Sequence, residues 1–400
     1  MGYDGTVRAL WAILTLAVGA AASGEDQIAR IRARVAETTA RIPNYTCLET
    51  IERRWYTDEF AEDRVADRVR IEVAVVDGKE QFSWPGGIPL DARELEEILR
   101  RGVSKSGDFS GFLSGVFVSN FATYTLVGEQ AGAIRRSVRY DYRVPAQAGY
   151  LLNRDAAQAV VAYHGSFWVD PETLDLMRLE IEGDDIPPKL KMSSAKLAID
   201  YERVAVGAGT FLLPRATDVR MAGTSGLEDR AVARFTGCRQ FLAESSLSFD
   251  DRPVAPAPID NDPGAELPAG LNLDVVLAAP IVRKTAAVGD VVQAELRKEV
   301  KTKGGVMVPK GAVVDGRIVT LETHGSAQSA DLLGLRFTRI RFGAKQVRLR
   351  AAVVKCGAGY RAVAGLQPWA EDGLLVSQGG FLALPKGLGL TLQTEAVPSH

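Results

Sequence analysis

Histidine is scarce in this sequence, and so are the motifs that mark catalysis. The three histidines, His164, His324 and His400, lie far apart along the chain, whereas a histidine-based metal site needs several ligands that converge. No G-x-S-x-G motif and no complete phosphate-binding glycine loop occurs in the sequence; these would indicate a hydrolase or a nucleotide site. We therefore expect neither a metal nor another cofactor, and we expect the protein not to be an enzyme.

A pair of carboxylates is the remaining catalytic alternative. Asp184 and Asp185 are adjacent in the segment EGDDIPP, whereas a glycosidase needs two carboxylates that face each other across a cleft. Adjacent residues on a turn bounded by proline usually face water, so we expect no catalytic role for them. An enzyme remains the third alternative, behind two binding functions.

An excess of charge of either sign is also absent. The chain has 48 Lys and Arg residues against 50 Asp and Glu residues, which gives a formal net charge of −2. A nucleic-acid-binding protein would present a basic face. We therefore expect no nucleic-acid partner.

No segment beyond the N-terminus is long and apolar enough for a membrane helix. Near the N-terminus, Arg8 precedes the apolar stretch ALWAILTLAVGAAA, which at about fourteen residues is short for a bilayer span. Small residues come next, at positions 20–24. This pattern is typical of a secretory signal peptide, which we predict over residues 1–24, with an uncleaved anchor as the alternative. We expect secretion across the inner membrane, a periplasmic location and no stable membrane span after cleavage.

Cysteine is as scarce as histidine, with Cys47, Cys238 and Cys356. Cys47 lies near the start of the first strand-like region and Cys238 near the end of the first half of the chain. A disulfide between them would join the two ends of one domain, as exported proteins allow. The alternative is that both are buried free thiols, and Cys356 is unpaired in either case.

Helical periodicity is confined to the first part of the chain. Apolar residues recur at spacings of three and four within residues 25–41, and Pro43 ends the pattern. Most of the chain after Pro43 has the alternation of β-strands, interrupted by turn signals such as Asp77-Gly78. These patterns predict an α+β fold that is mainly antiparallel β.

The chain divides into two parts at a proline- and aspartate-rich segment. Residues 250–268 lack periodicity, which is typical of a linker. We predict a β-sheet domain over residues 25–249 and a small β-domain, an all-β barrel or sandwich, over residues 269–400.

Aromatic residues cluster in the first of these parts. A second helix is predicted from Pro89 to Gly102, and phenylalanines punctuate residues 109–121 after it. Core packing is one interpretation of the cluster. The other is a cavity for a lipid or acyl chain, closed by residues 91–121, because a half-closed sheet under a helical lid leaves such a space. The candidate ligand-binding residues are Trp84, Phe109, Phe112, Leu113, Phe117, Phe121 and Trp168.

The order of these elements suggests a family. IPNYTCLETIERR and FTGCRQFLAES flank a run of strands that contains GSFWVDPETLDLMRLEIEGDDIP and LAIDYERVAVGAGTFLLPRATDVRM. With its N-terminal helix and internal helical segment, the region over residues 25–249 resembles the LolA/LolB-type lipoprotein carriers. The resemblance implies an unclosed barrel over helices, with an apolar cavity and no enzymatic activity.

A second resemblance lies in the C-terminal part. The segment LDVVLAAPIVRKTAAVGDVVQAELRKEVKTKGGVMVPKGAVVDGRI resembles the β-barrel segment of TrbI-like conjugation-channel proteins, in which a G-D-x-V-x-A strand precedes V-x-[IV]-P-K-G-[AS]. The resemblance implies the local β topology. In this segment we expect Lys310 to face water, and we expect a core from Val306, Val308, Val313 and Ile318.

These patterns together lead to an expected function. We predict a non-enzymatic exported protein of the cell envelope that binds a lipid or another apolar ligand in its N-terminal domain. The alternative is a structural or assembly scaffold of the envelope, which would act through contacts with an envelope protein partner.

Overall fold

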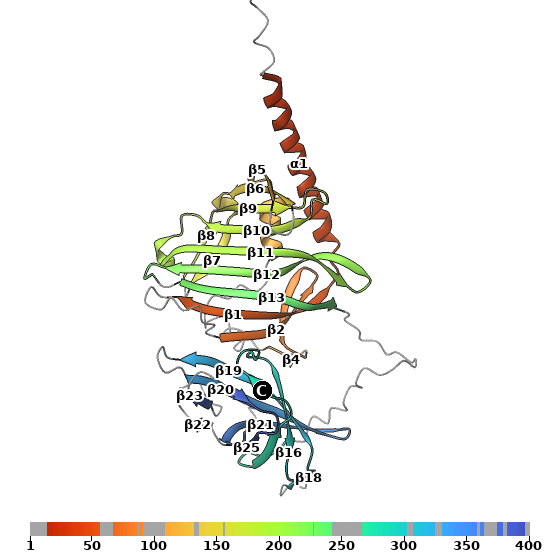
Figure 1. Ribbon diagram of the computed structural model, residues 1–400, viewed down its shortest axis with the longest axis vertical. Coiled ribbons are helices and arrows are strands. Elements are labelled where there is room, and N and C mark those ends of the chain that lie inside the picture. The colour runs from red at the N-terminus through yellow and green to blue at the C-terminus, as the bar shows by residue number, and fades with distance from the viewer. Residues whose placement is uncertain are drawn as a thin grey trace, which may run out of the picture.

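The computed structural model is built mainly of antiparallel β-strands (Figure 1). These strands surround two large hydrophobic cores and a smaller apolar cluster. The structure describes residues 14–56, 67–86, 88–90, 109–131, 136–154, 157–226, 228–241, 266–301, 307–324, 330–357, 361–363, 374–378 and 382–396. The prediction of a mainly antiparallel β protein is confirmed. The predicted linker, residues 250–268, and the predicted helix from Pro89 to Gly102 lie mostly outside the described residues.

The N-terminal core is enclosed by one long antiparallel sheet, which we call the large sheet. Its strands succeed one another across the sheet in this order: β4 (Ile88–Pro89), β3 (Lys79–Trp84), β2 (Asp67–Val76), β1 (Tyr45–Tyr56), β13 (Glu228–Gln240), β12 (Gly209–Gly223), β11 (Met192–Val206), β10 (Leu176–Gly183), β9 (Tyr163–Val169), β6 (Arg136–Val144) and β5 (Thr123–Ala131). In the described part of the chain, β5 pairs with β6 alone and is therefore an edge.

Helices cover one face of the large sheet. They are α1 (Leu14–Ala40), α3 (Phe109–Leu113) and the π-helix η1 (Ser114–Val118) that continues α3. Ile31 and Val35, one turn apart on α1, are buried in the same core as the sheet residues. The helix predicted over residues 25–41 is thus present, and α1 begins earlier and runs past the sheet (Figure 1).

The second core is enclosed by a closed barrel of six strands. The ring consists of β14 (Asn272–Leu277), β16 (Val291–Leu296), β19 (Val313–His324), β20 (Ala330–Phe342), β21 (Lys345–Cys356) and β25 (Gly389–Glu395), and β25 pairs again with β14. The choice between barrel and sandwich is thereby decided for the barrel. β20 also pairs with β23 (Leu374–Gln378), which pairs with β22 (Arg361–Val363).

Two-residue alternation sets the interior of the barrel. Val308 and Ile318 are buried and Lys310 is exposed, as expected. Val313 is half-buried, and its neighbour Val314 is the residue that enters the core. The prediction was one residue out of phase there, because the strand begins after the turn at residues 310–311 rather than within it.

Short ladders and turns complete the described chain. The paired strands are β7 (Tyr150–Arg154) with β8 (Ala157–Val161), β15 (Ile281–Val282) with β24 (Ala383–Leu384), and β17 (Val300–Lys301) with β18 (Met307–Val308). Two 3-10 turns, Ala146–Ala148 and Pro188–Leu190, lie between strands of the N-terminal part.

Backbone hydrogen bonds join the large sheet to the barrel. The amide of Arg70 donates to the carbonyl of Val288 over 2.8 Å, and the amide of Val288 donates to the carbonyl of Arg68 over 2.8 Å. The Arg70 guanidinium also pairs with the Asp290 carboxylate. Gly289 lies between them with φ at +96°, and a Cβ there would come within 2.3 Å of the Arg70 carbonyl oxygen. A residue without a side chain therefore permits this contact.

Candidate functional site

A pocket of about 620 Å³ lies between α1 and the helix-covered face of the large sheet. Its size falls in the range usual for small-molecule sites. Most of the lining is apolar and comes from segments far apart in the sequence: Val35, Ile42, Leu113, Leu176, Leu212 and Pro214. Two phenols, Tyr45 and Tyr201, add polar groups to this lining, and Lys79 and Glu80 add charges from β3. The pocket thus combines an apolar wall with a few polar groups.

A bulge between β11 and β12 shapes the wall that carries Tyr201. Asp200 is paired with Ala216, whereas Tyr201 is paired with Pro214, so Arg215 is the extra residue. Proline has no N–H to donate to a ladder, and it is therefore tolerated at such an irregularity. The side chain of Tyr201 packs against the N-terminal core and reaches the pocket.

Both phenols are shielded from water. Burial, and secondarily the Glu80 carboxylate, raise the pKa of Tyr45 to about 12. Burial, and secondarily Tyr45, raise the pKa of Tyr201 as well. Each phenol therefore keeps its proton at neutral pH and retains an O–H donor.

The helical cover brings together two of the predicted ligand-binding residues inside the core. The ring of Phe117 lies 4.9 Å from that of Phe167, and the ring of Phe112 lies 6.0 Å from that of Tyr163. Both phenylalanines are buried. Leu113, between them, is half-buried and lines the pocket.

An arginine of α1 holds this cover in place. The Nε of Arg32 donates to the carbonyl of Phe117 over 2.8 Å, and its Nη2 donates to the carbonyl of Ser119 over 2.9 Å. These carbonyls belong to the end of η1, where backbone acceptors lack partners within the helix. Gly115 allows η1 to approach the sheet, because a Cβ there would lie 2.3 Å from the Tyr163 hydroxyl.

The other predicted ligand-binding residues lie elsewhere. Trp84 is buried towards the barrel, where the Arg317 guanidinium lies 5.1 Å above its ring. Phe121 is 52% exposed, after the end of η1. Trp168 lies on the sheet face opposite the helices, where its Nε1 donates to Gln130 over 3.0 Å. The side chain of Phe109 lies outside the described residues, so Leu113 is the member of the set that lines the pocket.

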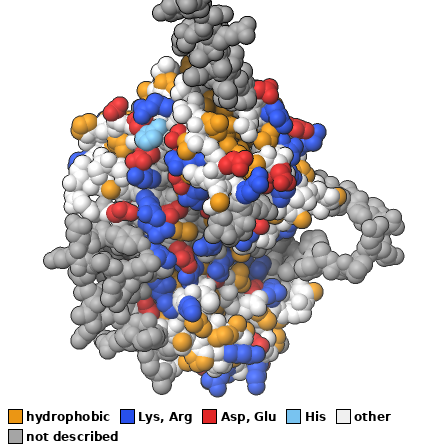
Figure 2. Space-filling model, turned by 45° about the horizontal axis from the view of Figure 1, so that its top comes forward, with side chains coloured by type: hydrophobic (Ala, Val, Ile, Leu, Met, Phe, Trp, Pro, Cys, Tyr) orange, Lys and Arg blue, Asp and Glu red, His pale blue; other side chains and the backbone are white. Residues whose placement is uncertain are grey.

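A second, polar groove of about 750 Å³ lies on that opposite face. Its lining consists largely of charged side chains that pair with each other: Arg178 with Asp200 over 2.6 Å, and Lys196 with Glu182 over 3.0 Å. On the face that Figure 2 draws, positive and negative side chains are interspersed. Since the charges of the groove are matched by neighbours, it offers no strong field for an ionic ligand.

His164 and Asp184, two candidates for chemistry, meet at the edge of this groove. The His164 Nδ1 lies 2.7 Å from an oxygen of Asp184, and Arg143 lies 3.1 Å from the other oxygen. The Asp184 carboxylate therefore serves an ion pair. Among the described residues no group of three His, Cys, Asp or Glu side chains could hold a metal ion.

A buried ion pair on the helix-covered face was not predicted from the sequence. Arg53 and Asp67 are 2% and 3% exposed, and the guanidinium donates to the carboxylate over 2.7 and 2.5 Å. Glu49, on the same face of β1 as Arg53, is also buried. The sequence contains a signal for this burial, since Glu49 and Arg53 are in phase with the buried Cys47 and Ile51 on β1.

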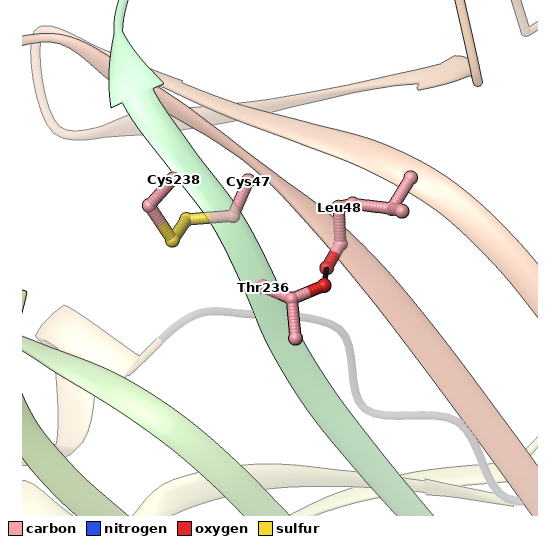
Figure 3. Close-up of a disulfide and its surroundings, with 4 residues drawn as sticks. All are labelled: Cys47, Leu48, Thr236 and Cys238. Atoms are coloured by element: carbon pink, nitrogen blue, oxygen red, sulfur yellow. Dashed lines mark hydrogen bonds between the residues drawn. A yellow bond between two sulfur atoms is a disulfide. The ribbon is translucent and has the colours of Figure 1, made fainter.

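The disulfide between Cys47 and Cys238 is present and joins β1 to β13 (Figure 3). It lies at an irregularity of the ladder, where the pairing passes from Thr46 with Arg239 to Leu48 with Thr236. The bond closes a segment that contains most strands of the large sheet. Cys356 is a free cysteine on β21.

Within the described residues, no helix has both the length and the apolar character that crossing a membrane requires.

Comparison with known proteins identifies no relative of this chain. No family model, no curated protein and no solved structure matches it.

Proposed function

We propose that the protein is an exported, non-enzymatic protein of the cell envelope that binds a lipid or another apolar ligand in the pocket between α1 and the large sheet. The observation that carries the proposal is the pocket itself, about 620 Å³ with mainly aliphatic walls. Apolar ligands gain affinity from the area that they remove from water. A helical cover over an antiparallel sheet is also what the resemblance to LolA/LolB-type carriers implies, and it supports this function.

Two observations support export. The pattern of residues 1–24 is typical of a signal peptide. The disulfide between Cys47 and Cys238 is of a kind that persists in oxidising compartments.

The experiment that tests ligand binding is native mass spectrometry of the purified protein, with solvent extraction of the molecules that it carries. We expect apolar adducts on the wild type, and we expect Leu212→Trp to lose them because the indole fills the pocket. Leu126→Trp is the matched control, since Leu126 is 48% exposed on edge strand β5, outside the pocket lining. Adducts that persist unchanged in Leu212→Trp, or a wild type that takes up no lipid from a total lipid extract, would contradict the proposal.

A scaffold function is the second candidate, and a different part of the molecule favours it. β5 offers unpaired backbone groups in the described structure, and four exposed apolar side chains lie on it or just before it: Val118, Phe121, Leu126 and Val127. Edges of this kind pair readily with another chain. A defined oligomer in light scattering would favour the scaffold, provided that Val127→Lys dissociates it and Leu212→Trp leaves it unchanged.

A further inference from the structure

One polar group in the pocket has no partner in the described structure. The hydroxyl oxygen of Tyr201 is buried and makes no hydrogen bond there. Other phenols of the same core are satisfied: Tyr140 donates to Gln27 over 2.8 Å, and Tyr142 donates to the carbonyl of Glu180 over 2.9 Å. A buried hydroxyl without a partner is unfavourable. Tyr201 therefore differs from its neighbours in a way that points to an outside partner.

The O–H of Tyr201 needs an acceptor. A phenol that keeps its proton presents one O–H donor beside an oxygen that can also accept, and Tyr201 is one of the residues that line the pocket. Thr39, also on the pocket wall, shows the contrast: its hydroxyl donates to the carbonyl of Val35 over 2.8 Å and needs nothing from a ligand.

The charges around the pocket favour an uncharged acceptor. Lys79 is the one cation among the described lining residues, and its side chain is exposed on β3. Glu80 contributes a negative charge that acts on Tyr45, and Tyr45 lies close enough to act on Tyr201. A carboxylate seated at Tyr201 would lose its hydration without a cation to replace it. A carbonyl oxygen accepts the same hydrogen bond without that penalty.

We propose that Tyr201 selects ligands that carry an uncharged carbonyl oxygen on an apolar body, such as acyl esters, over plain hydrocarbons and over free carboxylates. This inference rests on the proposed function, because it assigns the ligand class of the same pocket. It makes Tyr201 the residue that determines specificity, while the aliphatic wall supplies affinity for any apolar chain.

The test is displacement of the uncharged fluorescent probe N-phenyl-1-naphthylamine from the full-length protein by methyl decanoate, dodecane and decanoate at neutral pH. On the wild type we expect methyl decanoate to bind most tightly. In Tyr201→Phe, which keeps the ring and removes the donor, we expect the affinity for methyl decanoate to fall about fivefold, as for the loss of one hydrogen bond. The affinity for dodecane should stay unchanged.

Thr39→Val is the matched control, since it removes a hydroxyl of the pocket that already has a partner. We expect it to leave the ester and the hydrocarbon affinities as in the wild type. Equal ester affinities in the wild type and Tyr201→Phe, or a wild type that prefers decanoate, would overturn the inference while ligand binding still stands. A wild type that takes up neither the probe nor any of the three ligands would overturn the proposed function itself.

Discussion

The large sheet and the barrel use the same antiparallel pairing and differ in closure. In the barrel every strand of the ring has a partner on both sides, so the ring has no open edge. The large sheet has an open edge at β5, and its core is covered by helices rather than enclosed by further strands. A ring of six strands is filled by its own side chains, whereas a helix laid across a wide sheet leaves space. The difference explains why the ligand-sized apolar pocket lies in the open part.

Both cores bury polar groups beside their apolar side chains. In the barrel, the apolar interior is aliphatic apart from Phe337, and Asp331 is 1% exposed with the Arg283 guanidinium 3.5 Å away. The helix-covered face of the large sheet contains the Arg53–Asp67 ion pair and the Tyr201 hydroxyl. Buried polar groups reduce stability unless they are matched. Buried polar groups are therefore common to both parts, and the apolar pocket is what distinguishes the large sheet.

The largest expected effect is on the barrel. Leu335 is fully buried in its interior, and Leu335→Ala should lower the free energy of unfolding by about 3–5 kcal/mol, because a closed ring cannot collapse around the cavity. The same change at the pocket wall, Leu212→Ala, should cost about 1 kcal/mol, because Leu212 is half-buried beside existing space. Denaturant titration of both variants measures the two values, and equal losses would contradict the comparison.

The second effect is expected on the large sheet. Reducing the disulfide releases a closure over a sequence separation of 191 residues, and the loss of a native disulfide costs about 2–5 kcal/mol. We expect hydrogen exchange to accelerate in β1 and β13, while β14 and β25 keep their protection. Cys356→Ser, in the barrel, is the control and should change neither region. If reduction exposed both regions equally, the joint at Arg70 and Val288 would make them one cooperative unit.

The sequence predicts the barrel better than the site, for a physical reason. Burial in a strand has a local period of two, and β14 shows this period in the buried Leu273, Val275 and Leu277. The Asp77-Gly78 turn is also confirmed, with φ of 51° and 73°. Such features depend on neighbours in the sequence. The one-residue error at Val313 arose where a turn, rather than the alternation, fixes the phase.

The pocket depends on residues that no local pattern connects. The phenylalanines of residues 109–121 led to the prediction of ligand-binding residues in a helical lid, whereas Phe112 and Phe117 are packed in the core. The helical cover contributes Leu113 to the pocket, the other walls come from α1 and several strands of the large sheet, and the unpaired hydroxyl comes from Tyr201 on β11. The bulge that places Tyr201 is set by strand pairing across the hairpin. A single sequence shows the aliphatic residues but not the space between them.

The smallest effect concerns acid, and it compares two aspartates that are each held by two arginines. Burial acts to raise the pKa of Asp315 on β19, yet hydrogen bonds from Arg341 and Gln293 outweigh it and lower that pKa. The pKa of Asp218 on β12 is likewise lowered against its burial, by Arg230 and Arg220. A carboxyl with a lowered pKa stabilises the fold above its unfolded pKa, and this stability is lost as pH falls through its folded pKa.

Asp315 is the more buried of the two, with a side chain 9% exposed against 26% for Asp218. We therefore expect Asp315→Asn to lower the free energy of unfolding by about 1–2 kcal/mol at neutral pH. The barrel of this variant should also lose less stability than the wild type as the pH falls. Asp218→Asn should cost less than about 1 kcal/mol, as solvent-screened pairs do. Denaturant midpoints from pH 7 down to pH 3 would measure both. A steeper acid dependence at Asp218 than at Asp315 would contradict the expectation that the less exposed carboxylate contributes more to stability.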